Sequence, residues 1–177
     1  MLSDMEKRSR WLILVYQLPR EPSRYRVAVW RKLRTLGAIY LQDGAVALPE
    51  DAVTREQLEW LQLRVREAGG KATLWEAKPT TLAEEKALVE AFRSSREEAY
   101  ANIISDAERI RRKAKMGGGK ALEEELTKLE RELRAERRRD YFRSPLRKEA
   151  ASALKAAREA VRESASPEEG IISGGGS

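Results

Sequence analysis

The chain has 177 residues, of which 36% are charged and 6% aromatic, and its formal net charge is +6. It contains no Cys and no His, which excludes disulfides, thiolate nucleophiles, zinc fingers and imidazole base chemistry. All four Trp residues lie within the first 75 positions, so we expect a compact head followed by a thinner helical extension.

Positive charge is concentrated in two zones. Residues 1–36 include 9 basic and 3 acidic residues, and residues 105–150 include 15 basic and 10 acidic ones. Residues 37–104, between them, include 8 basic and 12 acidic residues. Basic zones attract polyanions at long range, and nucleic acid is the first candidate. The alternative is a solvated helical surface of a soluble protein.

The first predicted element is a buried strand over residues 11–18, which are mostly apolar and rich in aromatic and β-branched side chains. This run is too short to span a bilayer, and no small-residue cleavage site follows it. A cytoplasmic protein without a membrane partner is the simplest expectation.

A basic helix is predicted after this strand. It begins at Ser23, or at Glu21 with Pro22 in the first helical position, and ends near Leu36 because Gly37 follows.

The two sides of this helix differ in character at about 100° per residue. One side is apolar and carries Tyr25, Val29, Leu33 and Leu36. The nearly opposite side is cationic and carries Arg20, Arg24, Arg31 and Arg34. Arg26 falls at the edge of the apolar side, where it needs a carboxylate, a carbonyl group or a route to solvent.

The rest of the head alternates strands and a helix. Strands over residues 38–41 and 45–48 flank Asp43-Gly44, a strong hairpin motif. A helix then begins at Glu50, Asp51 or Thr54, ends near residue 68, and has an apolar stripe of Val53, Leu58, Leu61 and Val65 with Trp60 alongside. Gly69-Gly70 ends it, and residues 71–77 alternate as a strand.

This order predicts an α+β fold. Strand, helix, strand, strand, helix and strand form a ferredoxin-like βαββαβ head over residues 1–79, because each half buries its apolar face only by sharing one sheet.

A helical extension is predicted over residues 80–164. Thr81 and Glu84 form a capping box for a long helix, whose apolar positions are Leu82, Val89, Phe92, Tyr100, Ile103, Ile104, Ala107 and Ile110, with a weaker patch near Ser94-Ser95. The glycines at 117–119 form a flexible turn, after which a second helix folds back and carries a short heptad seam of Leu122, Leu126, Leu129 and Leu133. Tyr141-Phe142 is an apolar latch, Ser144-Pro145 starts a last helix, and residues 165–177 form a disordered tail.

The cationic side of the first helix is the strongest functional candidate. Guanidinium groups bind two oxygens of a phosphate or another tetrahedral oxyanion at once, so this row suits nucleic acid or a small oxyanion. The alternative is an exposed helix face, or ion pairs with the acidic middle segment.

A second basic cluster comprises Arg109, Arg111, Arg112, Lys113 and Lys115, and Arg137, Arg138 and Arg139 lie near it if the hairpin closes with these ends together. Solvated helix ends that offset the helix dipole are the alternative. Tyr16, Trp30 and Tyr40 fit core packing better than base stacking.

The stretch WLILVYQLPREPSRYRVAVWRKLRTLGAIYLQDGAVALP at residues 11–49 resembles the N-terminal domain of the chromate-resistance regulators of the ChrB type. KATLWEAKP at 71–79 and RRRDYFRSP at 137–145 are similar to further motifs of that family. The resemblance implies a cytoplasmic regulator of chromate-efflux genes, with DNA binding and chromate sensing. Longer members carry a second domain after this one.

A more distant likeness links the same order of elements to CRISPR adaptation nucleases and PaaX-type repressors. The nucleases carry a metal-binding Asp at the end of the first strand, where this chain has about Gln17. A neutral amide is a poor ligand for Mg²⁺, so a metal-dependent nuclease is disfavoured.

The leading prediction is a DNA-binding regulatory module that responds to chromate, with no enzyme activity and no cofactor. The binding residues would be Arg20, Arg24, Arg31, Arg34, Arg111, Arg112, Arg137 and Arg138. The alternatives are a small-oxyanion sensor whose partner is a protein, and a homodimeric scaffold joined through the leucine seam or through sheet edges.

Overall fold

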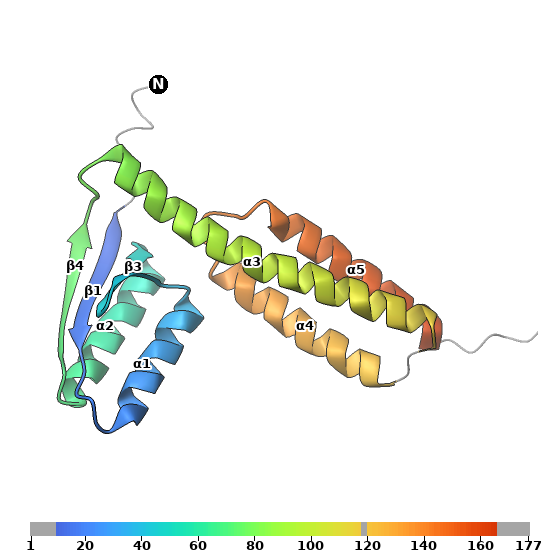
Figure 1. The fold of residues 1–177 in the computed structure, drawn as a ribbon, viewed down its shortest axis with the longest axis horizontal. Coiled ribbons are helices and arrows are strands. Elements are labelled where there is room, and N and C mark those ends of the chain that lie inside the picture. Colours follow the sequence, from blue (N-terminus) through green and yellow to red (C-terminus); the bar gives the residue numbers. More distant parts are fainter. Residues whose placement is uncertain (1–9, 118–119, 166–177) are drawn as a thin grey trace, which may run out of the picture. The chain divides into compact units, whose positions relative to one another are not determined.

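The structure, a computed structural model, describes residues 10–117 and 120–165. The elements in chain order are β1 (Trp11–Gln17), α1 (Ser23–Leu36), β2 (Ile39–Gln42), β3 (Ala45–Pro49), α2 (Ala52–Glu67), β4 (Lys71–Ala77), α3 (Leu82–Lys115), α4 (Lys120–Arg138) and α5 (Leu146–Ala165) (Figure 1). Two residues of the predicted glycine turn, 118–119, lie outside the described residues, as do 166–177 of the predicted tail.

These elements form two compact units. The first contains the described residues up to Ser95 together with Arg138–Arg143, and the second contains Arg96–Arg137 and the described residues from Ser144 onward. The contacts therefore divide the chain within α3, close to the weak apolar patch at Ser94-Ser95. The predicted domain boundary between residues 79 and 80 concerns which segment folds by itself, and it stays a prediction.

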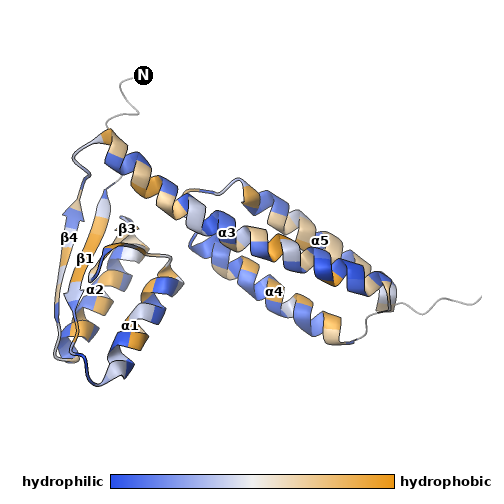
Figure 2. Cartoon of the chain, in the orientation of Figure 1, coloured by the Kyte–Doolittle hydropathy of each residue, from blue (hydrophilic) through white to orange (hydrophobic). Residues whose placement is uncertain are grey.

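The first unit is built on a four-stranded antiparallel sheet with the strand order β2-β3-β1-β4. This order and the βαββαβ sequence of elements confirm the ferredoxin-like head. β1 is central, and Leu14 pairs with Val46 on one side and with Leu74 on the other. Figure 2 shows β1 as mostly hydrophobic, as expected for a strand with neighbours on both edges.

α1 and α2 lie on the same side of this sheet (Figure 1). Their buried side chains join Leu12 and Leu14 of β1 in one core cluster, to which the helices contribute Val29, Leu33, Leu58, Leu61 and Val65. The predicted apolar side of α1 is therefore confirmed for Val29, Leu33 and Leu36, whereas Tyr25 is 37% exposed. Most of the stripe of α2 is confirmed as well.

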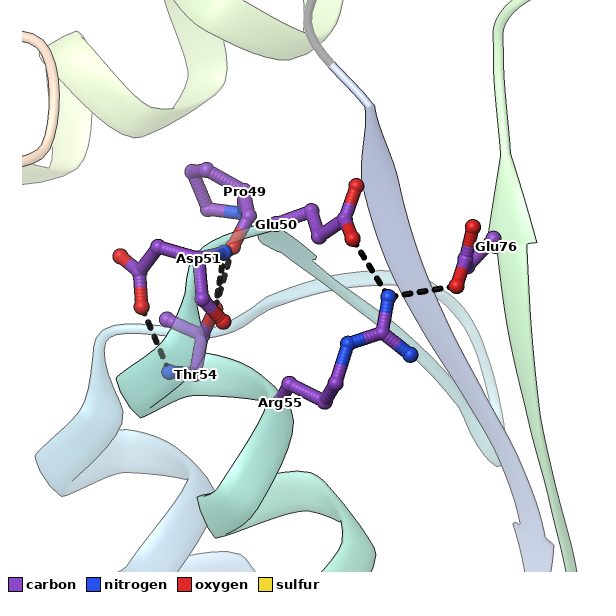
Figure 3. A network of polar contacts seen from close by, with 6 residues as sticks. All are labelled: Pro49, Glu50, Asp51, Thr54, Arg55 and Glu76. Carbon is purple, nitrogen blue, oxygen red and sulfur yellow. Dashed lines mark hydrogen bonds and ion pairs between the residues drawn. The ribbon is translucent and has the colours of Figure 1, made fainter.

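Two predicted members of the α2 stripe are exposed instead. Val53 is 65% exposed and Trp60 48% exposed, whereas Thr54 is buried. The cause is the helix cap: the Asp51 side chain accepts a hydrogen bond from the Thr54 backbone N–H at 2.7 Å, and the Thr54 hydroxyl donates to the Pro49 carbonyl at 2.6 Å (Figure 3). This cap turns Thr54 inward and Val53 outward.

Two glycines, Gly37 and Gly44, lie in turns that the sequence predicts. Gly37, with φ +72°, is the C-cap of α1 and donates its N–H to the carbonyls of Arg34 and Leu33. Gly44, with φ +74°, lies in the β2–β3 hairpin, and its carbonyl accepts a hydrogen bond from the Tyr16 N–H at 2.7 Å. An added Cβ at Gly44 would lie 2.5 Å from the Tyr16 carbonyl oxygen.

The start of α3 completes the first unit. The predicted capping box is present, because the Glu84 N–H donates to the Thr81 hydroxyl at 3.2 Å and the Glu84 carboxylate accepts from the Thr81 N–H at 3.0 Å. Leu82 is 52% exposed, so this predicted apolar position is not in the core. Further along α3, Phe92 is buried.

The predicted aromatic latch is confirmed. The Phe142 ring lies 5.8 Å from Trp11 and 5.6 Å from Phe92, measured between ring centroids, and the Tyr141 hydroxyl donates to the Leu36 carbonyl at 2.6 Å. A segment remote in sequence is thereby fastened to the sheet and to the end of α1.

The second unit packs α4 and α5 along α3 from Arg96 onward. Its core contains Tyr100, Ile103, Ala107, Ile110 and Ala114 of α3, the four leucines of the predicted seam, and Ala150, Leu154, Ala157 and Val161 of α5. The seam leucines are only 3–7% exposed. The prediction that this seam joins two copies of the chain is therefore wrong, because helices of the same chain already cover it.

No described helix is both long and apolar enough to cross a membrane.

Candidate functional site

The cationic side of α1 is fully displayed. Arg20, Arg24, Arg31 and Arg34 are exposed, and within residues 10–117 and 120–165 no carboxylate pairs with any of their side chains. α1 itself, SRYRVAVWRKLRTL, contains no acidic residue. The opposite side of the helix is held in the core by Val29 and Leu33, which fixes the direction in which the cations point.

Aromatic rings, instead of carboxylates, accompany two of these arginines. The Arg24 guanidinium lies 4.9 Å from the Tyr25 ring centroid, and that of Arg34 lies 5.3 Å from Trp30. Trp30 is 46% exposed and Tyr40 43% exposed, so the expectation that these two rings fill the core is wrong. An exposed cation–π contact is weak, at roughly 0.5–1 kcal/mol, so these cations stay available to a stronger anionic partner.

Arg55 shows how this unit treats an arginine that has a structural role. It bridges the Glu50 and Glu76 carboxylates and joins the start of α2 to β4 (Figure 3). The hydrogen bonds to Glu50 and then Glu76 raise the pKa of the Arg55 guanidinium. These carboxylates of the acidic middle segment serve Arg55, and the predicted alternative of ion pairs to the α1 row is not realised among the described residues.

The end of α1 gains one more cation from a distant segment. Arg139 donates from Nη1 to the Arg34 carbonyl at 3.0 Å. A cation at this end offsets the partial negative charge of the helix C-terminus. Arg138 belongs to the same compact unit as α1, whereas Arg137 belongs to the second unit.

The basic run near the end of α3 is divided between paired and unpaired cations. Arg109 pairs with Asp106 at 3.1 Å and with Glu125 at 2.6 Å, and the hydrogen bond from Arg109 lowers the pKa of the Glu125 carboxyl. Arg111 and Arg112 are exposed, with no carboxylate partner in the described part of the chain.

Arg137 does not join this run. Arg96 pairs with Glu136, and Arg109 pairs with Glu125, so α4 runs antiparallel to α3. The position of Arg96 lies about 20 Å along α3 from that of Arg109, at 1.5 Å per residue. The prediction that Arg137 lies near this run is wrong, because Arg137 follows Glu136 at the Arg96 end of the helix pair, away from Arg109.

Arg26 lies at a cavity that the sequence did not reveal. It lines a space of about 420 Å³ together with Leu18, Val27, Trp30, Gly44 and the pair Tyr16–Tyr40, whose hydroxyls are 2.9 Å apart. Burial, followed by the hydrogen bond with Tyr40, raises the pKa of the Tyr16 hydroxyl far above its usual range. The sequence offers Arg26 a carboxylate, a carbonyl group or a route to solvent. The structure shows the third of these, since the Arg26 side chain is exposed.

A second hollow lies between α1 and α2. It encloses about 730 Å³ and is lined by apolar, aromatic and cationic side chains, among them Tyr25, Arg31, Lys32, Trp60 and Arg64. Lys32 and Arg64 lie 5.7 Å and 5.2 Å from the Trp60 ring centroid. The sequence does not predict this hollow, because helical periodicity places Trp60 beside the apolar stripe.

In the described part of the chain, no three His, Cys, Asp or Glu residues gather in a group that could hold a metal ion. Gln17, the neutral residue near the place of the nuclease aspartate, is the exposed last residue of β1.

Comparison with known proteins identifies the family. The family model described as "Protein ChrB, N-terminal" matches residues 26–167, which is most of the chain. Protein ChrB of Cupriavidus metallidurans is 39% identical over 61 residues, which cover 34% of this chain and 19% of that protein, so the match spans about a fifth of the relative's length. No solved structure matches the chain. The residues matched by the family model show that this chain belongs to the ChrB N-terminal family.

Proposed function

We propose that this chain is a regulatory module of chromate resistance that binds DNA through the exposed arginine row of α1. The proposal rests on one observation above all: these guanidinium groups face solvent, and no carboxylate of the described residues pairs with them. Phosphate contacts from such a row set affinity and orientation, whereas base contacts set sequence preference. Arg111, Arg112 and Arg137 of the second unit and Arg138 of the first unit are proposed as further phosphate contacts. The protein is proposed as a cytoplasmic regulator and not as an enzyme.

A charge-matched pair of variants tests the role of α1. In Arg24→Ala/Arg31→Ala/Arg34→Ala, three exposed cations are lost without loss of a core side chain. The control, Lys128→Ala/Arg131→Ala/Arg134→Ala, removes the same charge from exposed positions of α4. We expect fluorescence anisotropy with labelled duplex DNA to show at least a tenfold loss of affinity for the α1 variant and a much smaller loss for the control. Equal losses would mean that net charge, and not this helix, governs binding.

The regulatory part of the proposal needs the DNA upstream of the chain's own gene. Capture of that DNA by the protein, with chromate present and absent, is the direct experiment. We expect a change in the retained amount on adding chromate but none on adding sulfate. Retention that responds to neither ion would leave DNA binding without an effector in this module.

A second candidate function, the sensing of a small oxyanion, is favoured by the cavity at Arg26. One guanidinium and the paired Tyr16 and Tyr40 hydroxyls supply donors to a tetrahedral oxyanion. Titration calorimetry with chromate and sulfate measures this directly, and Arg26→Gln removes the charge while keeping a donor. Saturable chromate binding that Arg26→Gln abolishes, in a protein that does not bind DNA, would favour the sensor over the DNA-binding module.

A further inference from the structure

The hollow between α1 and α2 combines features that a plain helix surface does not need. It encloses about 730 Å³, and its lining includes the rings of Tyr25 and Trp60. Its cations come from both helices, with Arg31 and Lys32 from α1 and Arg64 from α2. The space is large enough for a ligand the size of one nucleotide.

Trp60 is the central feature of this hollow. It is 48% exposed, although a tryptophan on an amphipathic helix normally turns toward the core. Lys32 and Arg64 lie near its ring from two different helices. Both are long side chains on flexible stems, so they can leave the ring for an anion while the ring accepts a planar group.

The charge around the ring is strongly one-sided. Within the described ranges, Arg31 and Lys32 have no carboxylate partner, and the lining acid Glu67 pairs with Arg64 at 3.2 Å on a solvent-exposed edge. A planar apolar surface beside three cations complements a ligand that joins an aromatic ring to a phosphate. Paired duplex bases would not reach this ring, because their faces are stacked within the double helix.

We propose that the α1–α2 hollow binds a nucleotide unit, with its base stacked on Trp60 and its phosphate held by Arg31, Lys32 and Arg64. The inference deepens the proposed function and rests on it where the nucleotide belongs to a bound strand. Two sources share this chemistry: a free nucleotide, and an unpaired nucleotide within single-stranded nucleic acid.

The experiment compares three ligands on the full chain: a nucleoside monophosphate, a labelled single-stranded oligonucleotide, and the duplex of the same sequence. Three variants are measured beside the unmodified chain. Trp60→Ala removes the stacking surface, Trp60→Phe keeps a smaller one, and Trp75→Ala is the matched control, because Trp75 is 58% exposed but lies on β4 outside this hollow. Circular dichroism melts confirm that each variant folds.

We expect Trp60→Ala to weaken single-strand binding by roughly 5- to 100-fold, which is the range for loss of one base-stacking contact. Trp60→Phe should recover part of this loss, and Trp75→Ala should change little. If the monophosphate also binds and depends on Trp60, the hollow takes free nucleotides. If only the single strand does, it takes nucleotides within a strand.

Other results would overturn the inference. These are the absence of binding to both the monophosphate and the single strand, or binding that Trp60→Ala leaves unchanged. If duplex binding falls in Arg24→Ala/Arg34→Ala but is unaffected by Trp60→Ala, and neither the single strand nor the monophosphate binds, the hollow has no such role while the proposed function stands. Loss of the proposed function alone would appear as monophosphate binding that needs Trp60 without any binding to DNA.

Discussion

Tyr16 is half-buried beside Tyr40, and burial raises the pKa of its hydroxyl well above that of a free tyrosine. The unfolded chain ionises Tyr16 near pH 10 while the folded chain keeps it neutral, so stability is fully present below about pH 10 and falls as pH rises toward the folded pKa.

We therefore predict that the free energy of unfolding, measured in urea, declines more steeply above about pH 10 in the unmodified protein than in Tyr16→Phe, which has no hydroxyl to ionise. Tyr40→Phe should also reduce the alkaline decline, because it removes the hydrogen bond that keeps Tyr16 neutral. Parallel pH profiles for all three proteins would show that the Tyr16 pKa is not raised.

Arg96 and Glu136 form an ion pair whose side chains are only 12% and 8% exposed. Removing one partner leaves the other charge poorly solvated, so Glu136→Ala should lower the free energy of unfolding by about 3–5 kcal/mol. The control is Glu130→Ala, which breaks a pair with a 61% exposed Arg158 and should cost at most about 1 kcal/mol. Similar costs for the two variants would mean that burial of the pair does not matter.

Individual residues are where sequence reasoning was least complete. The helical phase predicts that the α1 arginines point to solvent, because burial of Val29 and Leu33 fixes which side of this helix faces the core. The same periodicity places Trp60 beside the apolar stripe of α2, yet its side chain is 48% exposed. Which of two neighbouring helix positions faces the core depends on the packing partners, and the periodicity of a sequence does not specify these.

At the level of elements, the β2–β3 hairpin depends on a residue without a side chain at position 44. Gly44→Ala meets two penalties, a positive φ and a Cβ placed 2.5 Å from the Tyr16 carbonyl oxygen. We predict a loss of about 2–4 kcal/mol in the free energy of unfolding, measured by urea denaturation.

Gly117 separates these two penalties. Its φ is also positive, at +89°, but an added Cβ meets nothing within 4 Å. Gly117→Ala should therefore cost only the backbone term, about 1–2 kcal/mol. If Gly44→Ala costs no more than Gly117→Ala, the close approach to Tyr16 has no energetic weight.

The elements themselves were largely predictable. Each strand and helix of the head is bounded by Pro, Gly or a capping residue, and apolar spacing near two or near 3.6 residues distinguishes strand from helix. The partner of the leucine seam was not predictable, since a heptad pattern looks the same whether a neighbouring helix belongs to the same chain or to a second copy.

At the level of the whole molecule, the two compact units carry different spectroscopic reporters. All four Trp residues lie in the first unit, and the leucine seam lies in the second. Leu126→Asp buries a charge in the helical core and should destabilise that unit by at least about 3 kcal/mol.

We predict that Leu126→Asp lowers the far-ultraviolet helical signal while the near-ultraviolet Trp signal of the first unit persists. Solution mass measurements on the same samples check for a change of oligomeric state. A variant that keeps its helical signal but changes from dimer to monomer would contradict the assignment of the seam to the core. Homodimer formation through sheet edges stays a prediction.

The acidic and basic zones of the sequence differ in how far their charges are paired within the first unit. The acidic middle segment supplies the carboxylates that hold Arg55 and Arg64, so part of its charge is used within the first unit. The cations of α1 have no such carboxylate counterparts in the described ranges. A sequence shows the zones, but only the fold shows which charges neutralise each other.

If the α1 arginines contact DNA phosphates, DNA affinity must depend on salt concentration, and the strength of that dependence reports the number of contacts. Each phosphate contact contributes about 0.9 to the slope of log affinity against log salt concentration. We therefore expect Arg24→Ala/Arg31→Ala/Arg34→Ala to make this slope shallower by about 2–3, while the α4 control keeps the slope of the unmodified protein. A slope that the α1 substitutions leave unchanged would contradict phosphate contact by these arginines.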